Sequence, residues 1–240
     1  MAIPKERLQK SSLVDLILDR LRSDILEGRY EPGSALPPER ELASRYGVNR
    51  TSVKHALMKL ESVGLIDIRH GIGSMVLDYA ESGGAQLFEH LLWGSDMVDA
   101  KFLADALEVR VDVGGAIAWR AATRADGAAV ANLEKVLGQL EDAQGDAASV
   151  QALDMEFWKA MSQATGNRAF KLILNSLSVA YPRDNKFSSA FADGAAVHRR
   201  LALVLAAVVA GDADAAREAA EAHLTTSGEL ILESLDEGEG

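Results

Sequence analysis

The sequence contains no cysteine, which excludes disulfide bonds and metal sites built from thiolates and fits a reducing cytoplasm. It also lacks a long hydrophobic run, since the longest uncharged apolar stretch, residues 201–211, is too short to span a bilayer. Near the N-terminus, Asp15 and Asp19 interrupt any apolar segment that could form the core of a signal peptide. We therefore expect a soluble protein of the cytoplasm.

Catalytic motifs are missing as well. The sequence shows no nucleophile paired with a base, no glycine-rich phosphate loop and no paired-histidine motif. From residue 85 onward it shows no pattern typical of a strand and no repeat of fixed period. We expect a protein that is not an enzyme and uses no cofactor. A helical-bundle enzyme with an accessory DNA-binding-like domain stays open as a remote alternative.

Negative charge is abundant but unevenly distributed. The 240-residue chain has a net charge of −11, yet residues 1–78 carry 12 Lys and Arg against 11 Asp and Glu. The acidic excess therefore lies in the remaining residues. An acidic surface repels nucleic acid, so any contacts with DNA must come from the N-terminal part.

Residues 35–77 read ALPPERELASRYGVNRTSVKHALMKLESVGLIDIRHGIGSMVL and predict a helix-turn-helix. Pro38 suits the first position of one helix, and Gly47 suits its end. Asn49 suits the N-cap of a second helix, and the connection between the two is short. One stripe of that second helix is apolar at three- and four-residue steps: Val53, Ala56, Leu57 and Leu60.

The start of the second helix carries side chains that suit DNA, because such a helix presents its N-terminal residues to base edges in the major groove. They are Arg50, Thr51, Ser52 and, just beyond the first turn, Lys54. Residues 65–68 then predict a strand, a turn follows at His70, Gly71 and Gly73, and residues 75–77 predict the returning strand. Such a hairpin is the wing of a winged helix.

The charge of this segment supports DNA binding. Between residues 40 and 71, six cations face only three acidic residues: Arg40, Arg45, Arg50, Lys54, Lys59 and Arg69 against Glu41, Glu61 and Asp67. The plainer alternative is a small three-helix domain with a surface hairpin and no ligand. Charge, helix spacing and hairpin agree with each other, which favours DNA binding.

The run from Gly28 to Val76, GRYEPGSALPPERELASRYGVNRTSVKHALMKLESVGLIDIRHGIGSMV, resembles the N-terminal signature of GntR-type bacterial transcription regulators. The resemblance implies DNA contacts from both helices and from the wing tip, and a homodimer that reads a short palindrome. We include Asn49 in the predicted DNA-binding set. The set is Arg40, Asn49, Arg50, Thr51, Ser52, Lys54, His70 and Gly71.

The polar, glycine-rich segment 78–84 marks the predicted domain boundary. We expect a winged helix-turn-helix domain over residues 1–78 and an all-helical domain of six to seven helices over residues 79–240. Two runs, ALDMEFWKAMSQATGNRAFKLILN and GDADAAREAAEAHL, resemble landmark segments of the helical effector domain in the FadR branch of the GntR family. That resemblance implies effector binding between helices and dimerisation.

Many effector domains of that branch hold a divalent metal through Asp-x-x-x-His and two further histidines. Here Asp154 is followed four residues later by Trp158, which cannot bind a metal, while His223 matches the last family histidine. His198 lies one turn before the middle position. We predict no metal and read His223 as an interior structural residue. A metal-dependent sensor of a small organic or sugar acid stays open as the alternative.

Three local matches resemble the acyl-CoA-responsive type of the same branch: LEVR ending at Arg110, LILNSLSVAY ending at Tyr181, and SGE beginning at Ser227. They imply that Arg110, Tyr181 and Ser227 bind the effector. Arg110 lies on the apolar side of its predicted helix and needs a partner, either a carboxylate such as Asp154 or an anionic ligand. We expect a transcription regulator that senses long-chain acyl-CoA and controls genes of fatty-acid metabolism.

Overall fold

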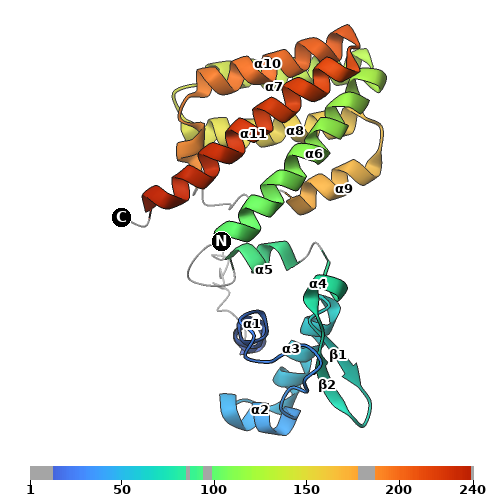
Figure 1. Ribbon diagram of the computed structural model, residues 1–240, viewed down its shortest axis with the longest axis vertical. Coiled ribbons are helices and arrows are strands. Elements are labelled where there is room, and N and C mark those ends of the chain that lie inside the picture. Colours follow the sequence, from blue (N-terminus) through green and yellow to red (C-terminus); the bar gives the residue numbers. More distant parts are fainter. Residues whose placement is uncertain (1–12, 85–86, 94–98, 178–186, 239–240) are drawn as a thin grey trace, which may run out of the picture. The chain divides into compact units, whose positions relative to one another are not determined.

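The computed structural model describes residues 13–84, 87–93, 99–177 and 187–238 (Figure 1). The chain divides into two compact units, residues 1–97 and residues 98–240, which we call the head and the helical unit. No helix in the described ranges is both long and apolar enough to cross a membrane.

The head begins with three helices, α1 (Leu13–Leu26), α2 (Glu39–Tyr46) and α3 (Arg50–Ser62). Gly47 ends α2 in the left-handed conformation, with φ of 65°, as predicted. Asn49 caps α3, because its side-chain oxygen accepts a hydrogen bond from the backbone N–H of Ser52 at 2.8 Å. Pro38 is the N-cap of α2, one position earlier than predicted. These local signals define the predicted helix-turn-helix.

An antiparallel hairpin follows α3, with β1 (Ile66–Arg69) and β2 (Gly73–Val76). Its register pairs Ile66 with Val76 and Arg69 with Gly73, so residues 70–72 form the tip. The predicted wing is therefore present. Gly73 belongs to the second strand rather than to the turn, because it pairs directly with Arg69.

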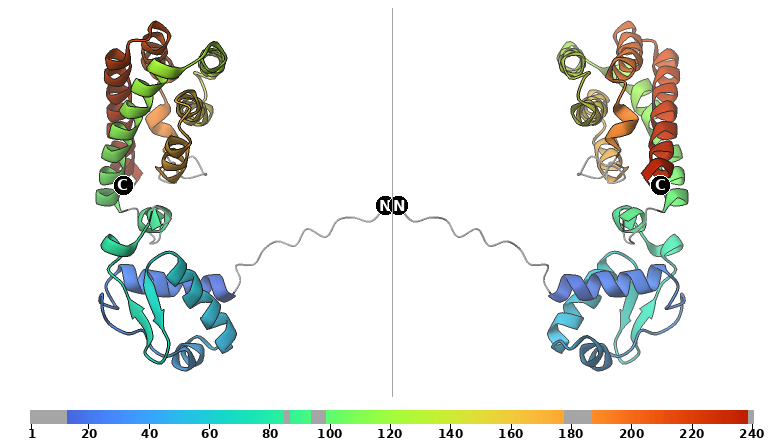
Figure 2. Two further views of the ribbon diagram at one scale, coloured as in Figure 1. Left: turned by 90° about the vertical axis from the view of Figure 1, so that its right-hand side faces the viewer. Right: turned by 90° about the vertical axis from the view of Figure 1, so that its left-hand side faces the viewer.

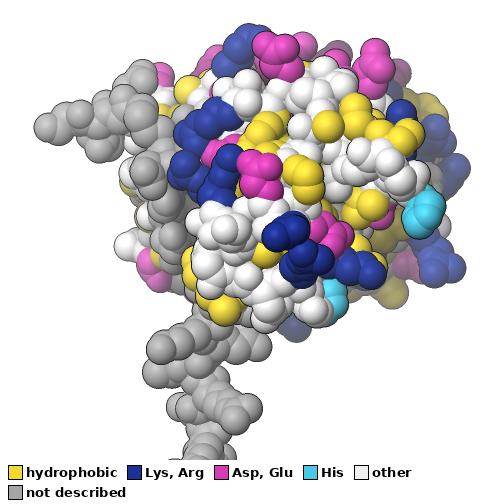
Figure 3. Space-filling model, turned by 90° about the horizontal axis from the view of Figure 1, so that it is seen from below, with side chains coloured by type: hydrophobic (Ala, Val, Ile, Leu, Met, Phe, Trp, Pro, Cys, Tyr) yellow, Lys and Arg dark blue, Asp and Glu magenta, His cyan; other side chains and the backbone are white. Residues whose placement is uncertain are grey.

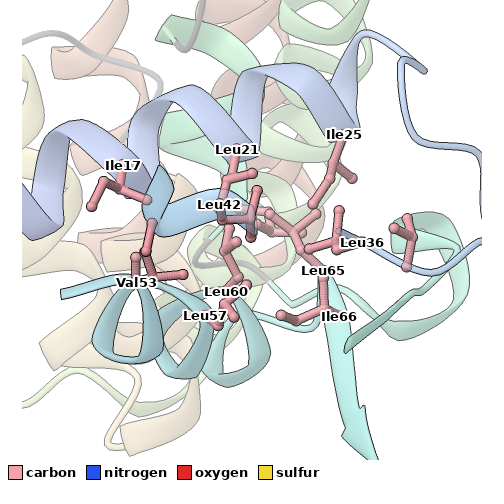
Figure 4. Packing of buried hydrophobic residues seen from close by; sticks show 14 residues of the cluster. Ile17, Leu21, Ile25, Leu36, Leu42, Val53, Leu57, Leu60, Leu65 and Ile66 are labelled. Atoms are coloured by element: carbon pink, nitrogen blue, oxygen red, sulfur yellow. The ribbon is translucent and has the colours of Figure 1, made fainter. Parts of the chain in front are cut away.

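The core of the head is a single cluster of apolar side chains from α1, α2, α3 and the first strand (Figure 4). Ile17, Leu21 and Ile25 of α1 point toward the side of α3 that carries Val53, Leu57 and Leu60. This packing fixes α3 against α1 and leaves the opposite side of α3 exposed. Burial of such side chains stabilises the head by roughly 1.5–3 kcal/mol for each fully buried residue.

The short helices α4 (Tyr79–Ser82) and α5 (Phe88–Trp93) lie after the domain boundary that the sequence predicted at residue 78. Leu87 nevertheless belongs to the core cluster of the head, and Leu91 packs against it. The division by contacts therefore falls later, after residue 97. The physical reason is that a polar, glycine-rich segment marks a bend in the chain but not the last apolar contact.

Two glycines of the head allow a test of this packing. Gly64 has φ of +79°, and a Cβ there would lie 2.5 Å from the carbonyl oxygen of Ser82. Gly47 has φ of +65° but open space around it. We expect Gly47→Ala to destabilise the protein by about 1–2 kcal/mol, the cost of the left-handed conformation, and Gly64→Ala by clearly more. Urea denaturation measures both, and equal losses would contradict the contact with Ser82.

The helical unit contains the long helices α6 (Ala100–Arg124) and α11 (Ala213–Gly238), which run side by side in every view (Figures 1 and 2). A Cβ at Gly114 of α6 would lie 2.0 Å from Leu224 Cδ1 of α11, and one at Gly115 would lie 2.5 Å from Glu221 Oε1. The two helices therefore approach closely because these positions have no side chain.

The other helices of this unit complete a bundle. They are α7 (Gly127–Asp142), α8 (Ala147–Ala164), α9 (Arg168–Leu177), the 3-10 helix η3 (Ser188–Phe191) and α10 (Gly194–Ala210). Asp126, Asp146 and Asp193 cap helices by accepting backbone hydrogen bonds. The described residues from 99 onward contain six α-helices and no strand, which confirms the predicted fold class.

Candidate DNA-binding surface and interior site

The first turns of α3 place the predicted DNA-binding side chains on the surface of the head. Arg50, Thr51 and Lys54 are exposed, and Ser52 is partly buried. Val53 between them is fully buried, because its side chain faces α1. On α2, Arg40 is exposed as well. One side of α3 therefore faces the core of the head, and the other side carries polar residues that are open to solvent.

Among the described residues of the head, most Lys and Arg side chains are paired with a neighbouring carboxylate. Salt bridges are made by Arg20, Arg22, Arg29, Arg45, Lys59 and Arg69. Within the described part of the head, Arg40, Arg50 and Lys54 form no such ion pair. Figure 3 looks at the end of the head that carries α2 and the hairpin tip, and shows Lys and Arg side chains gathered there with histidine among them. Cations without an internal partner are suited to phosphates and bases.

Arg45, also on α2, is an example of a cation that already has partners within the head. Its guanidinium donates a hydrogen bond to the Tyr30 hydroxyl at 3.1 Å and lies 3.6 Å from a Glu41 oxygen. The hydrogen bond to Tyr30, and then the charge of that phenol, raise the pKa of Arg45 above its ordinary value. Arg45 is therefore a matched control for Arg50, of the same type but already engaged within the head.

The remaining predicted residues lie at the ends of elements. The side-chain oxygen of Asn49 is used in capping α3, so only its amide NH2 group is left for DNA. His70 and Gly71 are exposed at the hairpin tip, where Gly71 has φ of +78°. The sequence analysis did not single out Ile72, whose side chain is 67% exposed at the same tip. An isoleucine between the glycines at 71 and 73 is the signal that could have identified it.

The two lysines of α3 provide a direct test of the surface. Lys54 is exposed and without an ion pair among the described residues, whereas the Lys59 ammonium lies 2.7 Å from an Asp15 oxygen. We expect Lys54→Ala to reduce the slope of log affinity for DNA against log salt by about 1, because one phosphate contact is lost. Lys59→Ala serves as the control and should leave the slope unchanged. Equal slopes for Lys54→Ala and the wild type in an anisotropy titration would remove Lys54 from the interface.

A second candidate site lies inside the helical unit, where four helices each contribute a polar side chain. Asp154 of α8 is 1% exposed and His223 of α11 is fully buried, with His223 Nε2 lying 2.7 Å from Asp154 Oδ1. Arg110 of α6 places its Nη2 at 3.8 Å from Asp154 Oδ2. Arg200 of α10 donates a hydrogen bond from Nε to His223 Nδ1 at 3.4 Å. Buried charges of this kind require partners, which these four residues provide for one another.

The geometry assigns the tautomer of His223. A guanidinium nitrogen only donates, so Nδ1 of the imidazole accepts from Arg200. The ring proton therefore lies on Nε2, which donates to Asp154. Burial lowers the pKa of the Arg200 guanidinium, and the charge of Asp154 acts in the opposite direction. The sequence analysis did not identify Arg200, because nothing in its local pattern shows that it reaches His223.

A pocket adjoins this group of residues. It contains about 350 Å³ of empty space, part of it open to solvent, and Arg110 is the only charged residue among the described residues that line it. The other lining residues are Val113, Gly114, Met155, Trp158, Leu174, Leu177 and Leu224. The Trp158 ring stacks on His223, with centroids 6.1 Å apart. The pocket thus combines one cation with an apolar wall, as small-molecule sites commonly do.

The three predicted effector residues are only partly brought together. Arg110 lines the pocket, and its proximity to Asp154 agrees with the carboxylate partner that the sequence analysis considered. Ser227 is 1% exposed, but its hydroxyl donates to the Leu224 carbonyl of its own helix, and it is not among the pocket-lining residues. Tyr181 lies outside the described residues.

A divalent metal does not fit the residues as they are arranged. Histidine binds a metal through an unprotonated ring nitrogen, and both nitrogens of His223 are engaged. In the described ranges of the chain, no three His, Asp or Glu side chains gather closely enough to hold a metal ion. Trp158 occupies the position at which a further histidine would complete such a set.

Comparisons with known proteins give a family match for each of the two units. The family described as "Bacterial regulatory proteins, gntR family" matches residues 13–76, and the family described as "FCD domain" matches residues 105–226. The first match covers the three helices and the hairpin of the head. The second covers α6 through most of α11 and includes Arg110, Asp154, Arg200 and His223.

Three curated proteins show which regulators this chain resembles in sequence. An HTH-type transcriptional regulator of Mycobacterium tuberculosis, described as uncharacterized, is 36% identical over 88% of this chain and 86% of its own length. A "Fatty acid metabolism regulator protein" of Serratia proteamaculans is 32% identical over 68% of this chain and 66% of its own. A "Putative L-lactate dehydrogenase operon regulatory protein" of Escherichia coli is 33% identical over 89% of this chain and 84% of its own.

Proposed function

The chain belongs to the GntR family of bacterial transcription regulators and carries an FCD domain, and on this premise we propose that it is a homodimeric sensor of long-chain fatty acyl-CoA. In this proposal the head binds a palindromic duplex and the helical unit binds the effector. The genes under its control would serve fatty-acid metabolism, as the name of the Serratia proteamaculans relative suggests for that protein.

The DNA-binding part of the proposal is supported by three cations that form no ion pair among the described residues of the head. Arg40 and Arg50 come from two helices of the helix-turn-helix, and Lys54 lies one turn further along α3. Arg50 can bind guanine through two hydrogen bonds in the major groove, while Lys54 suits a phosphate. The exposed tip at His70 and Gly71 is available to a neighbouring stretch of the duplex. A dimer would repeat this arrangement about a two-fold axis, which a palindrome mirrors.

The effector-binding part of the proposal is supported by the pocket that Arg110 lines. Its wall is formed almost entirely by apolar side chains, which suits an acyl chain, and its single lining guanidinium suits an anionic group. Binding there contacts α6, α8, α9 and α11 together. An effector that prefers one arrangement of these helices shifts the population of the dimer toward it, by no more than its difference in affinity for the two states.

A mobility-shift titration with a long-chain acyl-CoA tests the proposal. We expect the effector to release the protein from its operator. Val113→Trp adds bulk inside the pocket without altering the contacts of Asp154, so this variant should bind DNA normally but lose the response. An unchanged wild-type complex at saturating acyl-CoA would exclude this effector and leave the DNA-binding half intact.

A second candidate is a metal-dependent sensor of a small organic acid. It is favoured by the name of the Escherichia coli relative and by the direct contact of Asp154 with His223. It would require the bond between these two residues to open, because a metal needs the ring nitrogen that now donates to Asp154. Metal analysis of protein purified without chelator separates the candidates, since one metal ion for each chain would favour the second.

A further inference from the structure

We propose that guanidinium groups replace a metal ion in the interior site, so that the pocket binds the anionic head group of its ligand directly through Arg110 and the indole N–H of Trp158. This inference rests on the proposed function only in taking the helical unit as the sensing unit. It adds two residues, Trp158 and Arg200, that no family match assigns. It also names the ligand class: an oxygen anion, carboxylate or phosphate, joined to an apolar tail.

The first argument is that the polar atoms around His223 already form a closed set. His223 Nε2 donates to Asp154 Oδ1 at 2.7 Å, and His223 Nδ1 accepts from Arg200 Nε at 3.4 Å. Asp154 Oδ2 faces Arg110 at 3.8 Å. Arg200 thus stands against the one imidazole nitrogen that carries no proton. By holding Nδ1 as an acceptor, Arg200 keeps the ring proton on Nε2, which is the nitrogen that a metal beside Asp154 would need.

The second argument is the charge balance. Arg110 and Arg200 bring two positive charges to the site, and Asp154 brings one negative charge while His223 is neutral. Within the described residues, the Arg200 guanidinium has no carboxylate oxygen within 4 Å. Asp193 and Arg199 also act on Arg200, but with opposite signs. Arg200 is thus a partly buried cation whose hydrogen-bond partner is a neutral imidazole, and a cation in such a place favours an anion nearby.

The third argument is the indole of Trp158. The side chain is 3% exposed, and its Nε1 is buried with no hydrogen-bond acceptor among the described residues. An unsatisfied buried donor costs about 1–3 kcal/mol, so a native structure rarely keeps one without a use. Trp158 and Arg110 line the same pocket, which brings an N–H donor and a cation to one cavity. Because this N–H is covered, a carboxylate or phosphate oxygen bound in the pocket would accept from both groups once the lining side chains shift.

The size of the pocket limits the ligand. The enclosed part of the pocket is small, because its 350 Å³ of empty space includes open solvent. Medium-chain probes with eight carbons are therefore suitable. The head group can come from a free fatty acid or from the phosphates of an acyl-CoA. Octanoate, octanoyl-CoA and the neutral octanamide distinguish these sources.

Calorimetry with the full-length protein tests the anion site. We expect the wild type to bind octanoate or octanoyl-CoA at least tenfold more tightly than octanamide. Trp158→Phe keeps an aromatic ring against His223 but removes the donor, and should weaken binding of the preferred anion about tenfold. Trp119→Phe is the control, because the Trp119 indole donates to Asp214 Oδ1 at 3.2 Å and lies outside the pocket lining.

Equal affinity for octanamide and both anions, or an unchanged affinity in Trp158→Phe, would overturn the proposal. This result is distinct from failure of the proposed function. That failure would show as a DNA complex that acyl-CoA leaves intact, whatever the calorimetry finds.

Zinc binding tests the replacement of a metal by Arg200. Residues 154 and 158 are four apart on α8 and therefore share one face of the helix. Trp158→His would place a histidine beside Asp154 and His223 and complete a set of three ligands. We expect Trp158→His alone to bind no zinc, because Arg200 still holds the ring proton of His223 on Nε2. We expect the double variant Trp158→His, Arg200→Ala to bind one zinc ion for each chain.

Circular dichroism confirms that both variants are folded before zinc is added. Zinc binding by Trp158→His as tight as that by the double variant would show that Arg200 does not keep a metal out. Absence of zinc binding by the folded double variant would show that these residues do not form a blocked metal site. Either result overturns the proposal.

Discussion

Arg50→Ala is expected to weaken binding to the protein's own operator by about 1–3 kcal/mol, roughly five- to 150-fold, and to relax its preference at one base pair. The guanidinium of Arg50 stands at the first position of α3, is exposed and forms no ion pair among the described residues. A bidentate contact to guanine depends on the shape of that group, so Arg50→Lys should recover only part of the loss.

Arg45→Ala is the matched control for Arg50. Arg45 is also an exposed arginine of the helix-turn-helix, but its guanidinium contacts Tyr30 and Glu41. Its removal should change operator affinity by much less than removal of Arg50. Anisotropy titrations at one fixed salt concentration compare the variants. Loss of affinity in Arg45→Ala equal to that in Arg50→Ala would indicate a general charge effect rather than a contact from α3.

Asp154→Asn is expected to destabilise the protein by about 3–5 kcal/mol, the usual cost of removing one partner from a buried charge pair. The amide keeps the shape of the carboxylate and can still accept from His223, so the loss reports the charge. Without it, Arg110 and Arg200 lose the negative charge of Asp154, which lies between them. Chemical denaturation measures the change in the free energy of unfolding.

Glu156→Gln is the control on the same helix. Glu156 lies 3.5 Å from the Lys159 ammonium, and both side chains are largely exposed. Exposed pairs of this kind contribute about 0–1 kcal/mol, so this variant should remain near wild-type stability. A loss in Asp154→Asn as small as that in Glu156→Gln would show that the interior site does not depend on the Asp154 charge.

The fold of the head could be predicted because its signals are local. A glycine in the left-handed conformation at position 47, a capping Asn49 and apolar residues at helical spacing each determine their own element. The hairpin follows from glycines at 71 and 73, where positive φ is needed. The boundary of the head was harder to predict, because Leu87 joins its core through a contact distant in sequence.

The interior site was only partly accessible from sequence, because its residues come from four helices. The resemblance to the FadR branch singled out Arg110, Asp154 and His223, and helical spacing placed Arg110 on an apolar side, but neither gave a distance between them. Arg200 could not be identified, since on α10 it differs from neighbouring Arg199 only in the direction of its side chain. The roles of the DNA-binding and effector residues remain predictions, and Tyr181 lies outside the described residues.

The most direct measurement of the central claim is selection of duplexes from a random library by the full-length protein, followed by titration of the selected duplex at several salt concentrations. The account predicts that a palindrome is enriched. It also predicts that the triple variant Arg40→Ala, Arg50→Ala, Lys54→Ala lowers the slope of log affinity against log salt by roughly 2–3, about 0.9 for each lost phosphate contact. Selection without symmetry, or a triple variant that keeps the wild-type slope, would contradict it.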